Sequence, residues 1–211
     1  MELSVYKIDG KESGKKVVLD DAVFGVEPND HAIYLDVKQY LANQRQGTSK
    51  TKERNEVAYS TKKIVRQKGS GGARHGSIKA PIYVGGGRIF GPKPRDYSFK
   101  LNKKLKQLAR KSALSLKAKD GAITVLEQFN MEIPKTSEMV NICKNLNLTE
   151  RAKVLMILPD NNNNIYLSSR NLQRVKVITS AELTTYDLMN ATNLVLVEDT
   201  VGQLNTQLGR A

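Results

Sequence analysis

The second half of the chain alternates between short apolar runs and stretches in which apolar residues recur at helical spacing. The apolar runs occupy residues 122–126, 153–158, 174–178 and 193–197, and helices are predicted at about 136–147, 164–171, 183–190 and 200–208. Buried strands that alternate with helices in this way indicate βαβ units, which build a parallel sheet with helices on both faces. We therefore expect an α/β fold, a three-layer αβα domain with a mainly parallel sheet.

The N-terminal part of the chain adds two strands and a helix to this picture. Apolar residues predict strands near residues 3–8 and 17–19, with a turn at Asp9-Gly10. A helix then begins at Asn29 or Asp30, either of which can cap it, and runs to about residue 46, where Gly47 stops it. Its expected inner face consists of Ile33, Val37, Tyr40 and Leu41.

A further helix is predicted between Asn102, which can cap it, and Gly121, which ends it. Its expected inner stripe consists of Leu105, Leu108, Ala109, Ser112 and Leu116. Lys103 and Lys104 occupy its first turn, where the helix dipole disfavours cations. An external anion at the start of this helix would remove the conflict.

Residues 47–100 show neither helical nor strand periodicity, and their composition explains why. Residues 43–111 contain 19 Lys and Arg but only 3 acidic residues, and eight glycines lie between residues 69 and 91. Such a segment cannot bury enough apolar surface to offset its ordering entropy, so it needs a polyanion such as nucleic acid. We expect one globular domain, made of residues 1–46 and 101–211, and a long extended basic loop at about 47–100 that stays unstructured until RNA binds it.

Several features bear on the compartment. The chain has one cysteine, Cys143, its longest apolar run is 154–158, and its first residues lack the basic start and apolar stretch of a signal peptide. A single cysteine forms no internal disulfide, and so short a run does not span a bilayer. The sequence therefore predicts a cytoplasmic protein without a membrane partner.

The glycine-rich run at 66–77 differs from the two common nucleotide-binding loops. A Walker loop requires Lys and then Ser or Thr after its last glycine, but Ser77-Ile78 follow Gly76. A dinucleotide fingerprint that starts at Gly69 and Gly71 requires a third glycine where Arg74 stands. The remaining interpretations are a flexible linker and an RNA-binding loop, and cations spaced regularly among the glycines favour the second.

No catalytic or metal-binding constellation is apparent in the sequence. His75 lies among cations and has no acid to orient it, so we expect it to stack on or hydrogen-bond to RNA. His31 is expected at the surface or as a cap, and Cys143 as a small buried apolar residue. The acidic pairs Asp20-Asp21 and Glu198-Asp199 have no recognisable basic partner. We expect no enzyme activity, no cofactor and no metal.

Five aromatic residues are interleaved with the cations of the loop. An aromatic residue is normally part of a core, but in polar and glycine-rich surroundings stacking on unpaired bases is an equal alternative. No signature of a common RNA-binding module accompanies them, which favours recognition of a folded RNA by shape and phosphate. These residues are Tyr59, Tyr83, Phe90, Tyr97 and Phe99.

At these motifs the chain resembles a known family, the universal large-subunit ribosomal protein number four. The resemblance is carried by Arg45-Gln46-Gly47-Thr48, Arg66-Gln67-Lys68-Gly69-Ser70-Gly71, residues 73–81, Gly86-Gly87, residues 90–97 and Asn102-Lys103-Lys104. It implies an α/β domain on the outer surface of the large subunit and a loop that threads into 23S ribosomal RNA. It also implies a role in early assembly.

By motif position, the resemblance places Arg66, Gln67, Lys68 and Gly69 near the loop tip, where members of the family line the nascent-peptide exit tunnel. The implied partners are 23S ribosomal RNA, neighbouring large-subunit proteins and the nascent peptide. The expected RNA-binding residues are Arg45, Gln46, Thr48, Lys50, Lys52, Arg54, Lys62, Lys63, Arg66, Gln67, Lys68, Gly69, Gly71, Arg74, His75, Ser77, Lys79, Arg88, Lys93, Arg95, Lys103 and Lys104.

Two other functions share part of these features. An RNA-binding regulator of its own messenger RNA would use the same basic loop, and the identity of the bound RNA distinguishes it from a ribosomal component. An α/β enzyme acting on a phosphorylated or nucleic-acid substrate would require acidic and basic groups that converge at the carboxyl ends of the strands. The sequence gives no sign of such a site.

Overall fold

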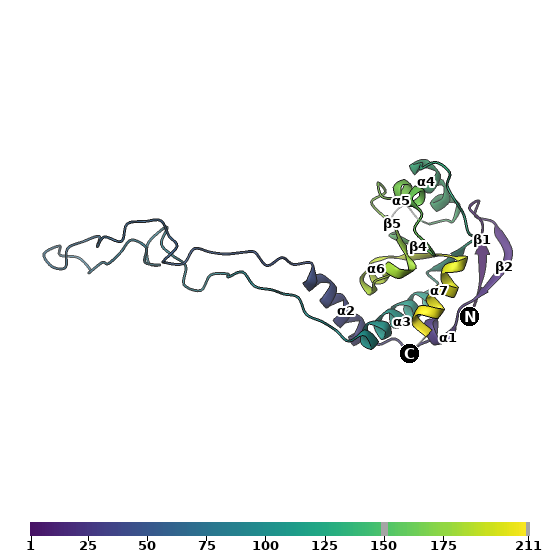
Figure 1. Cartoon of the computed structure of the whole chain (residues 1–211), viewed down its shortest axis with the longest axis horizontal. Helices are drawn as coiled ribbons and strands as arrows, with labels where there is room; N and C mark the ends of the chain where they lie inside the picture. The colour runs from purple at the N-terminus through teal and green to yellow at the C-terminus, as the bar shows by residue number, and fades with distance from the viewer. Residues whose placement is uncertain (149–151, 210–211) are drawn as a thin grey trace. The chain divides into compact units, whose positions relative to one another are not determined.

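The computed structural model describes residues 1–148 and 152–209. It contains a six-stranded sheet in the order β2-β1-β3-β6-β4-β5, shown in Figure 1. Within this sheet β2 is antiparallel to its neighbour, and the other four pairs of neighbouring strands are parallel. The expected mainly parallel sheet is thereby confirmed. The strands are β1 (Glu2–Tyr6), β2 (Glu12–Val18), β3 (Ile123–Leu126), β4 (Val154–Leu158), β5 (Val175–Thr179) and β6 (Asn193–Val197).

The helices predicted from periodicity are all present, with boundaries shifted by a few residues. Helix α1 was not predicted; it is a single turn that Asp20 caps by accepting a hydrogen bond from the Ala22 amide at 2.9 Å. The helices are α1 (Asp21–Phe24), α2 (Asp30–Asn43), α3 (Lys103–Lys119), α4 (Thr136–Asn145), α5 (Asn163–Ser169), α6 (Thr185–Asn190) and α7 (Glu198–Gly209), with a short 3-10 helix at Ser180–Glu182.

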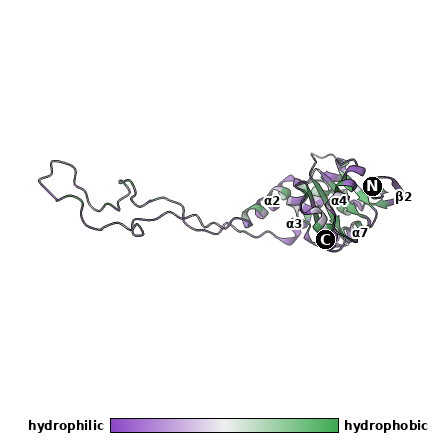
Figure 2. Cartoon of the chain, turned by 90° about the horizontal axis from the view of Figure 1, so that it is seen from above, coloured by the Kyte–Doolittle hydropathy of each residue, from purple (hydrophilic) through white to green (hydrophobic). Residues whose placement is uncertain are grey.

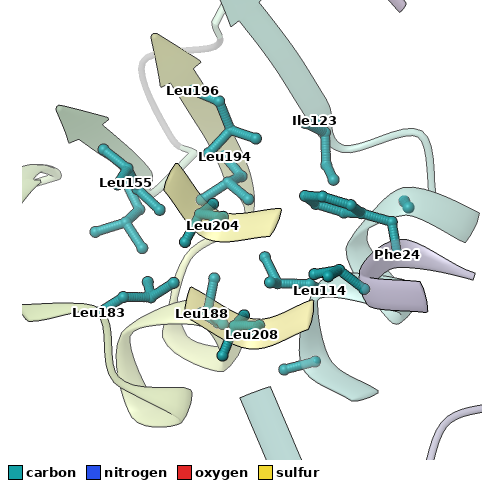
Figure 3. Close-up of a cluster of buried hydrophobic side chains, with 14 of the residues drawn as sticks. Phe24, Leu114, Ile123, Leu155, Leu183, Leu188, Leu194, Leu196, Leu204 and Leu208 are labelled. Carbon is teal, nitrogen blue, oxygen red and sulfur yellow. The ribbon is translucent and has the colours of Figure 1, made fainter. Parts of the chain in front are cut away.

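Side chains of the central strands alternate between two apolar cores, one on each face of the sheet. Leu194 and Leu196 of β6 lie in the larger core with residues of α1, α2, α3, α6 and α7, part of which Figure 3 shows. Val195 and Val197 lie in the second core, which α4 and α5 cover. Helices therefore cover both faces, and the three-layer αβα architecture is confirmed.

The inner stripe predicted for α3 is correct only in part. Ala109 and Ser112 are buried as expected, but the three leucines of the predicted stripe are half-buried. The fully buried residues are instead concentrated between Ser112 and Ala118, on every side of the helix. Helices α1 and α6 both pack on α3, so the second half of α3 is enclosed and a one-sided amphipathic pattern does not describe it.

Helix α2 begins as predicted but ends at Asn43, before the expected stop at Gly47. The side-chain oxygen of Asn29 caps its first turn by accepting from the Ala32 amide at 3.0 Å. Leu41, predicted to face inward, is 46% exposed, whereas Asp36 is buried. The hydroxyl of Thr185 on α6 donates to the Asp36 carboxylate at 2.5 Å, which satisfies this buried polar group.

Candidate nucleic-acid interface

By their contacts, the residues fall into two units, Met1–Leu41 with Lys100–Ala211, and Ala42–Phe99. The second unit is the basic segment, and beyond the end of α2 it contains no helix or strand. Its outgoing and returning halves are nevertheless joined by backbone hydrogen bonds, and Figures 1 and 2 show them side by side. The bonds run from Arg95 to Gly47, Thr51 to Pro92, Arg88 to Lys52 and Ile64 to Gly76, at 3.0–3.1 Å.

The two ends of the basic segment are held together around the ring of Tyr97. The guanidinium carbons of Arg45 and Arg95 lie 3.8 and 4.5 Å from the centre of its ring. A hydrogen bond from Arg95 lowers the pKa of the Tyr97 phenol, and the charge of Arg45 acts in the same direction. Gly47 has a φ of +68°, and a Cβ atom there would overlap the Arg95 carbonyl oxygen. Glycine is therefore required at this close approach of the two halves.

The few acidic side chains of the segment are engaged within it. Lys50 pairs with Glu56 at 2.5 Å and Lys93 with Glu53 at 2.5 Å. The hydrogen bond from Lys50 lowers the pKa of Glu56, and the hydrogen bond to Glu53 raises the pKa of Lys93. Asp96 accepts from the amide and hydroxyl of Ser98, both at 2.8 Å. No acid within residues 42–99 remains to neutralise the other cations.

The central part of the segment is open and glycine-rich. The Arg66 guanidinium donates to the Gly69 carbonyl at 2.9 Å, and Lys63 donates to the Gln67 side chain. Gly69 and Gly71 both have positive φ, at +83° and +67°. Three of the four predicted tip residues, Arg66, Gln67 and Gly69, thus take part in local hydrogen bonds.

Most of the predicted RNA-binding residues are exposed, and the half-buried exceptions include His75, Ser77 and Lys79. The ring of His75 lies 5.7 Å from that of Tyr83 in a tilted arrangement. Lys103 and Lys104 are exposed in the first turn of α3, where Asn102 makes no side-chain capping bond. The anion expected at this helix start stays a prediction.

The aromatic residues of the segment divide into two groups. Phe90 is 100% exposed, whereas the ring of Tyr97 is already in contact with two guanidinium groups. Exposed aliphatic residues accompany Phe90, notably Ile82, which is 77% exposed, and Ile89. These aliphatic residues were not predicted as part of the interface, because an isolated Ile or Val in the sequence carries no signal for nucleic-acid binding.

The carboxyl ends of β3 and β6, where enzymes of this architecture bind substrates, hold an ion-paired cluster. Lys15 lies 3.0 Å from the Glu127 carboxylate and 3.5 Å from that of Glu198. The hydrogen bond to Glu127 is the main cause that raises the pKa of Lys15. The expectation that Glu198 has no basic partner was therefore wrong. Within residues 1–148 and 152–209, no group of three potential metal ligands is found, and no helix is long and apolar enough to cross a membrane.

His31 is exposed and stacks on Tyr34, which confirms its expected place at the surface. Cys143, expected to be buried, is half-buried and lines a cavity of about 460 Å³ together with Val140 and Leu172. Burial raises the pKa of its thiol. The cysteine is therefore a poor nucleophile at neutral pH, since the thiolate is the reactive form.

Alkylation of Cys143 by iodoacetamide at about pH 8 is expected to be several-fold slower in the folded protein than in denaturant, because a raised pKa leaves less thiolate. The rate should continue to increase with pH above the ordinary thiol pKa. Mass spectrometry of this single thiol measures both rates. Equal alkylation rates in the folded and the denatured protein would contradict the raised pKa of the Cys143 thiol.

The part of the chain that the structure describes thus combines a basic segment with unneutralised cations and ion-paired acidic groups at the ends of β3 and β6. The family model described as "Ribosomal protein L4/L1 family" matches residues 17–207. A protein of Parabacteroides distasonis is 65% identical over 201 residues, covering 95% of this chain and 96% of the relative. Proteins of Bacteroides fragilis and Flavobacterium johnsoniae are each 57% identical, covering 99% and 100% of this chain and all of each relative.

All three relatives are named "Large ribosomal subunit protein uL4". The chain belongs to the ribosomal protein L4/L1 family. The resemblance seen at the loop motifs is thereby confirmed. Because this family consists of structural ribosomal proteins, the expectation that the chain is no enzyme is confirmed as well.

Proposed function

We propose that this chain is a structural constituent of the large ribosomal subunit that binds 23S ribosomal RNA and supports early subunit assembly. Neighbouring ribosomal proteins are its further partners, and residues 66–69 help line the nascent-peptide exit tunnel. Family membership supports the ribosomal location. The observation that carries the RNA contact is the basic segment, in which glycines separate exposed cations and, among residues 42–99, only two cations have an acidic partner.

RNA binding by the basic segment depends on the balance between an entropic cost and an electrostatic gain. A segment without helix or strand loses conformational freedom when it becomes fixed. Neutralised phosphates release counterions, which supplies the opposing favourable term. Exposed Phe90 and Ile82 add apolar area for unpaired bases. The partner that fits is therefore a folded RNA that surrounds the segment.

The salt dependence of binding measures this electrostatic term directly. If about 8–10 phosphates are neutralised, the slope of log affinity against log salt is expected to lie between about −6 and −9. Filter binding of the purified chain to 23S ribosomal RNA across a salt series gives the slope. A slope near zero would refute the mechanism. Stronger binding to the chain's own messenger RNA than to 23S RNA would favour the regulatory alternative.

Replacing Arg66, Lys68 and Arg74 with alanine is expected to weaken RNA binding and to reduce the salt slope by about 2–3, because three phosphate contacts are lost. The melting temperature should remain nearly unchanged, since these exposed side chains contribute nothing to either core. A matched variant with alanine at Lys7, Lys11 and Lys144 is the control. Unfolding of the domain by the first variant would contradict the proposal.

Sedimentation of the tagged protein against ribosomal subunits tests the cellular partner. We expect the chain to migrate with the large subunit at moderate salt, and the variant at residues 66, 68 and 74 to shift toward the free fractions. Migration independent of ribosomal subunits in both cases would remove the ribosomal assignment.

A further inference from the structure

Helix α2 leads directly into the basic segment, and its two halves are held to the α/β domain by different kinds of contact. In the first half, Ile33 lies in the larger core, and the Asn29 amide donates to the Ser112 hydroxyl on α3 at 3.1 Å. In the second half, inward positions carry polar side chains, because Asp36 and Gln39 are only 8% and 4% exposed. The turns that precede the segment therefore depend on polar contacts as well as on apolar packing.

Two consecutive residues of α6 contact the second half of α2. The Thr185 hydroxyl donates to the Asp36 carboxylate at 2.5 Å, and both side chains are buried. The ring of Tyr186 stacks on that of Tyr40, with the ring centres 4.8 Å apart and the planes inclined by 18°. Because Tyr40 follows Asp36 by four residues, the two pairs occupy successive turns of one face of α2. These two pairs, which we call the α2–α6 contact, restrict both rotation and sliding of α2.

Helix α6 is itself fixed to the sheet and to the larger core. At its start, the Thr184 hydroxyl accepts a hydrogen bond from the Asp187 amide at 3.1 Å. The Asp187 carboxylate is buried and pairs with Lys176 of β5 at 2.6 Å. Leu188 is completely buried in the larger core. The position of α6 is therefore set by the domain, and the α2–α6 contact transmits it to α2.

The pair of Asp36 and Thr185 is better suited to positioning α2 than to stabilising it. A buried carboxylate costs desolvation energy, which a neutral hydroxyl offsets only in part. Apolar side chains of similar volume would often hold two helices together equally well. What the hydrogen bond adds is direction, because its geometry is satisfied only when α2 and α6 have one particular alignment.

We propose that the α2–α6 contact is a positioning element for RNA binding, which holds the last turns of α2 in place before RNA arrives. This inference rests on the proposed function, because it takes RNA to be the ligand of the basic segment. Its physical basis is preorganisation, since residues that are fixed in advance do not have to be ordered during binding. Asp36 and Thr185 are buried, so the pair acts without touching a phosphate.

The test compares two Thr→Val substitutions in the full chain. Thr185→Val removes the hydrogen bond to Asp36, whereas the control Thr200→Val removes one from a similarly buried hydroxyl to the Ile157 carbonyl, at 3.1 Å. Both should lower the urea midpoint of unfolding, because each loses a buried hydrogen bond. Only Thr185→Val should weaken binding to 23S ribosomal RNA, by about 5–30-fold, as expected if about one further residue has to be ordered. Its salt slope should equal that of the wild type, since no phosphate contact is lost.

Amide hydrogen exchange in the RNA-free protein supplies a readout that a general loss of stability does not change. Thr185→Val should increase exchange at Tyr40 and Leu41 relative to Ile33, because the second half of α2 opens locally. Thr200→Val should leave this ratio unchanged.

A second variant serves if Thr185→Val does not fold. Tyr186→Leu removes the stacking on Tyr40 at a half-buried position, and Tyr166→Leu on the exposed side of α5 is its control. The same weaker binding with an unchanged salt slope is expected for Tyr186→Leu alone. Equal RNA affinities of each variant and its control, or a reduced salt slope at either α6 position, would overturn the proposal.

The outcome also separates this inference from the function on which it rests. Failure of the wild-type chain to bind RNA in a salt-dependent way would remove the proposed function itself. Steep salt dependence in the wild type and weakened binding by the variant at residues 66, 68 and 74, combined with normal binding by the α6 variants, would remove only the positioning role.

Discussion

Replacing Leu196 with alanine is expected to lower the free energy of unfolding by about 2–5 kcal/mol. Leu196 is completely buried in β6, which pairs with β3 on one side and β4 on the other. Its side chain lies in the larger core near Leu194 and Leu204, as Figure 3 shows. Hydrogen bonds to both neighbouring strands prevent β6 from moving into the space left by the missing methyl groups, so the cavity persists.

Urea unfolding followed by circular dichroism measures this loss in the RNA-free protein. The matched variant is Leu41→Ala on α2, a position that helical spacing predicts to be inward but that is 46% exposed. We expect the free energy of unfolding of this variant to differ from that of the wild type by no more than about 0.5 kcal/mol, as for other surface positions. Similar losses for the two leucines would contradict the assigned burial.

Replacing Gly47 with alanine is expected to disrupt the paired end of the basic segment and to weaken RNA binding by about 5–30-fold. An L-residue at a φ of +68° is strained by about 1–2 kcal/mol, and the new Cβ would overlap the Arg95 carbonyl oxygen. The hydrogen bond from the Arg95 amide to the Gly47 carbonyl should therefore open more often.

Amide hydrogen exchange at Arg95 reports this opening, and filter binding reports the loss of affinity. Gly72→Ala is the control within the same segment, because Gly72 has no positive φ and a Cβ atom there would have no neighbouring atom within 4 Å. Identical exchange and affinity for the two variants would show that the close approach at Gly47 has no role in forming the interface.

The apolar strands of the second half could be predicted because their signal is local. Every residue of β4 is buried. The run Val154–Leu158 is apolar throughout, so its composition alone predicts a strand that is buried on both faces. The inner stripe of α3 could not be predicted as well, because Leu114 and Ala118 are buried against elements distant in sequence. A helical pattern identifies one buried face, but it does not say how many neighbours a helix has.

In the candidate interface too, local features could be predicted from the sequence, whereas contacts between distant residues could not. Composition alone located the basic segment and most of its exposed cations. The stacking of Arg45 and Arg95 on Tyr97 depends on pairing between halves about 50 residues apart, which no local pattern reveals. The pairing of Lys15 with Glu127 was missed for the same reason, since 112 residues separate the two side chains.

The parallel pairing of β1 with β3 has a consequence for the covalent continuity of the fold. Strand β1 precedes the basic segment in the chain and β3 follows it, yet they are hydrogen-bonded neighbours in one sheet. A protease that nicks the segment would leave two polypeptides that remain associated through this pair of strands and the shared core. We therefore expect the two fragments to remain folded together as a noncovalent complex.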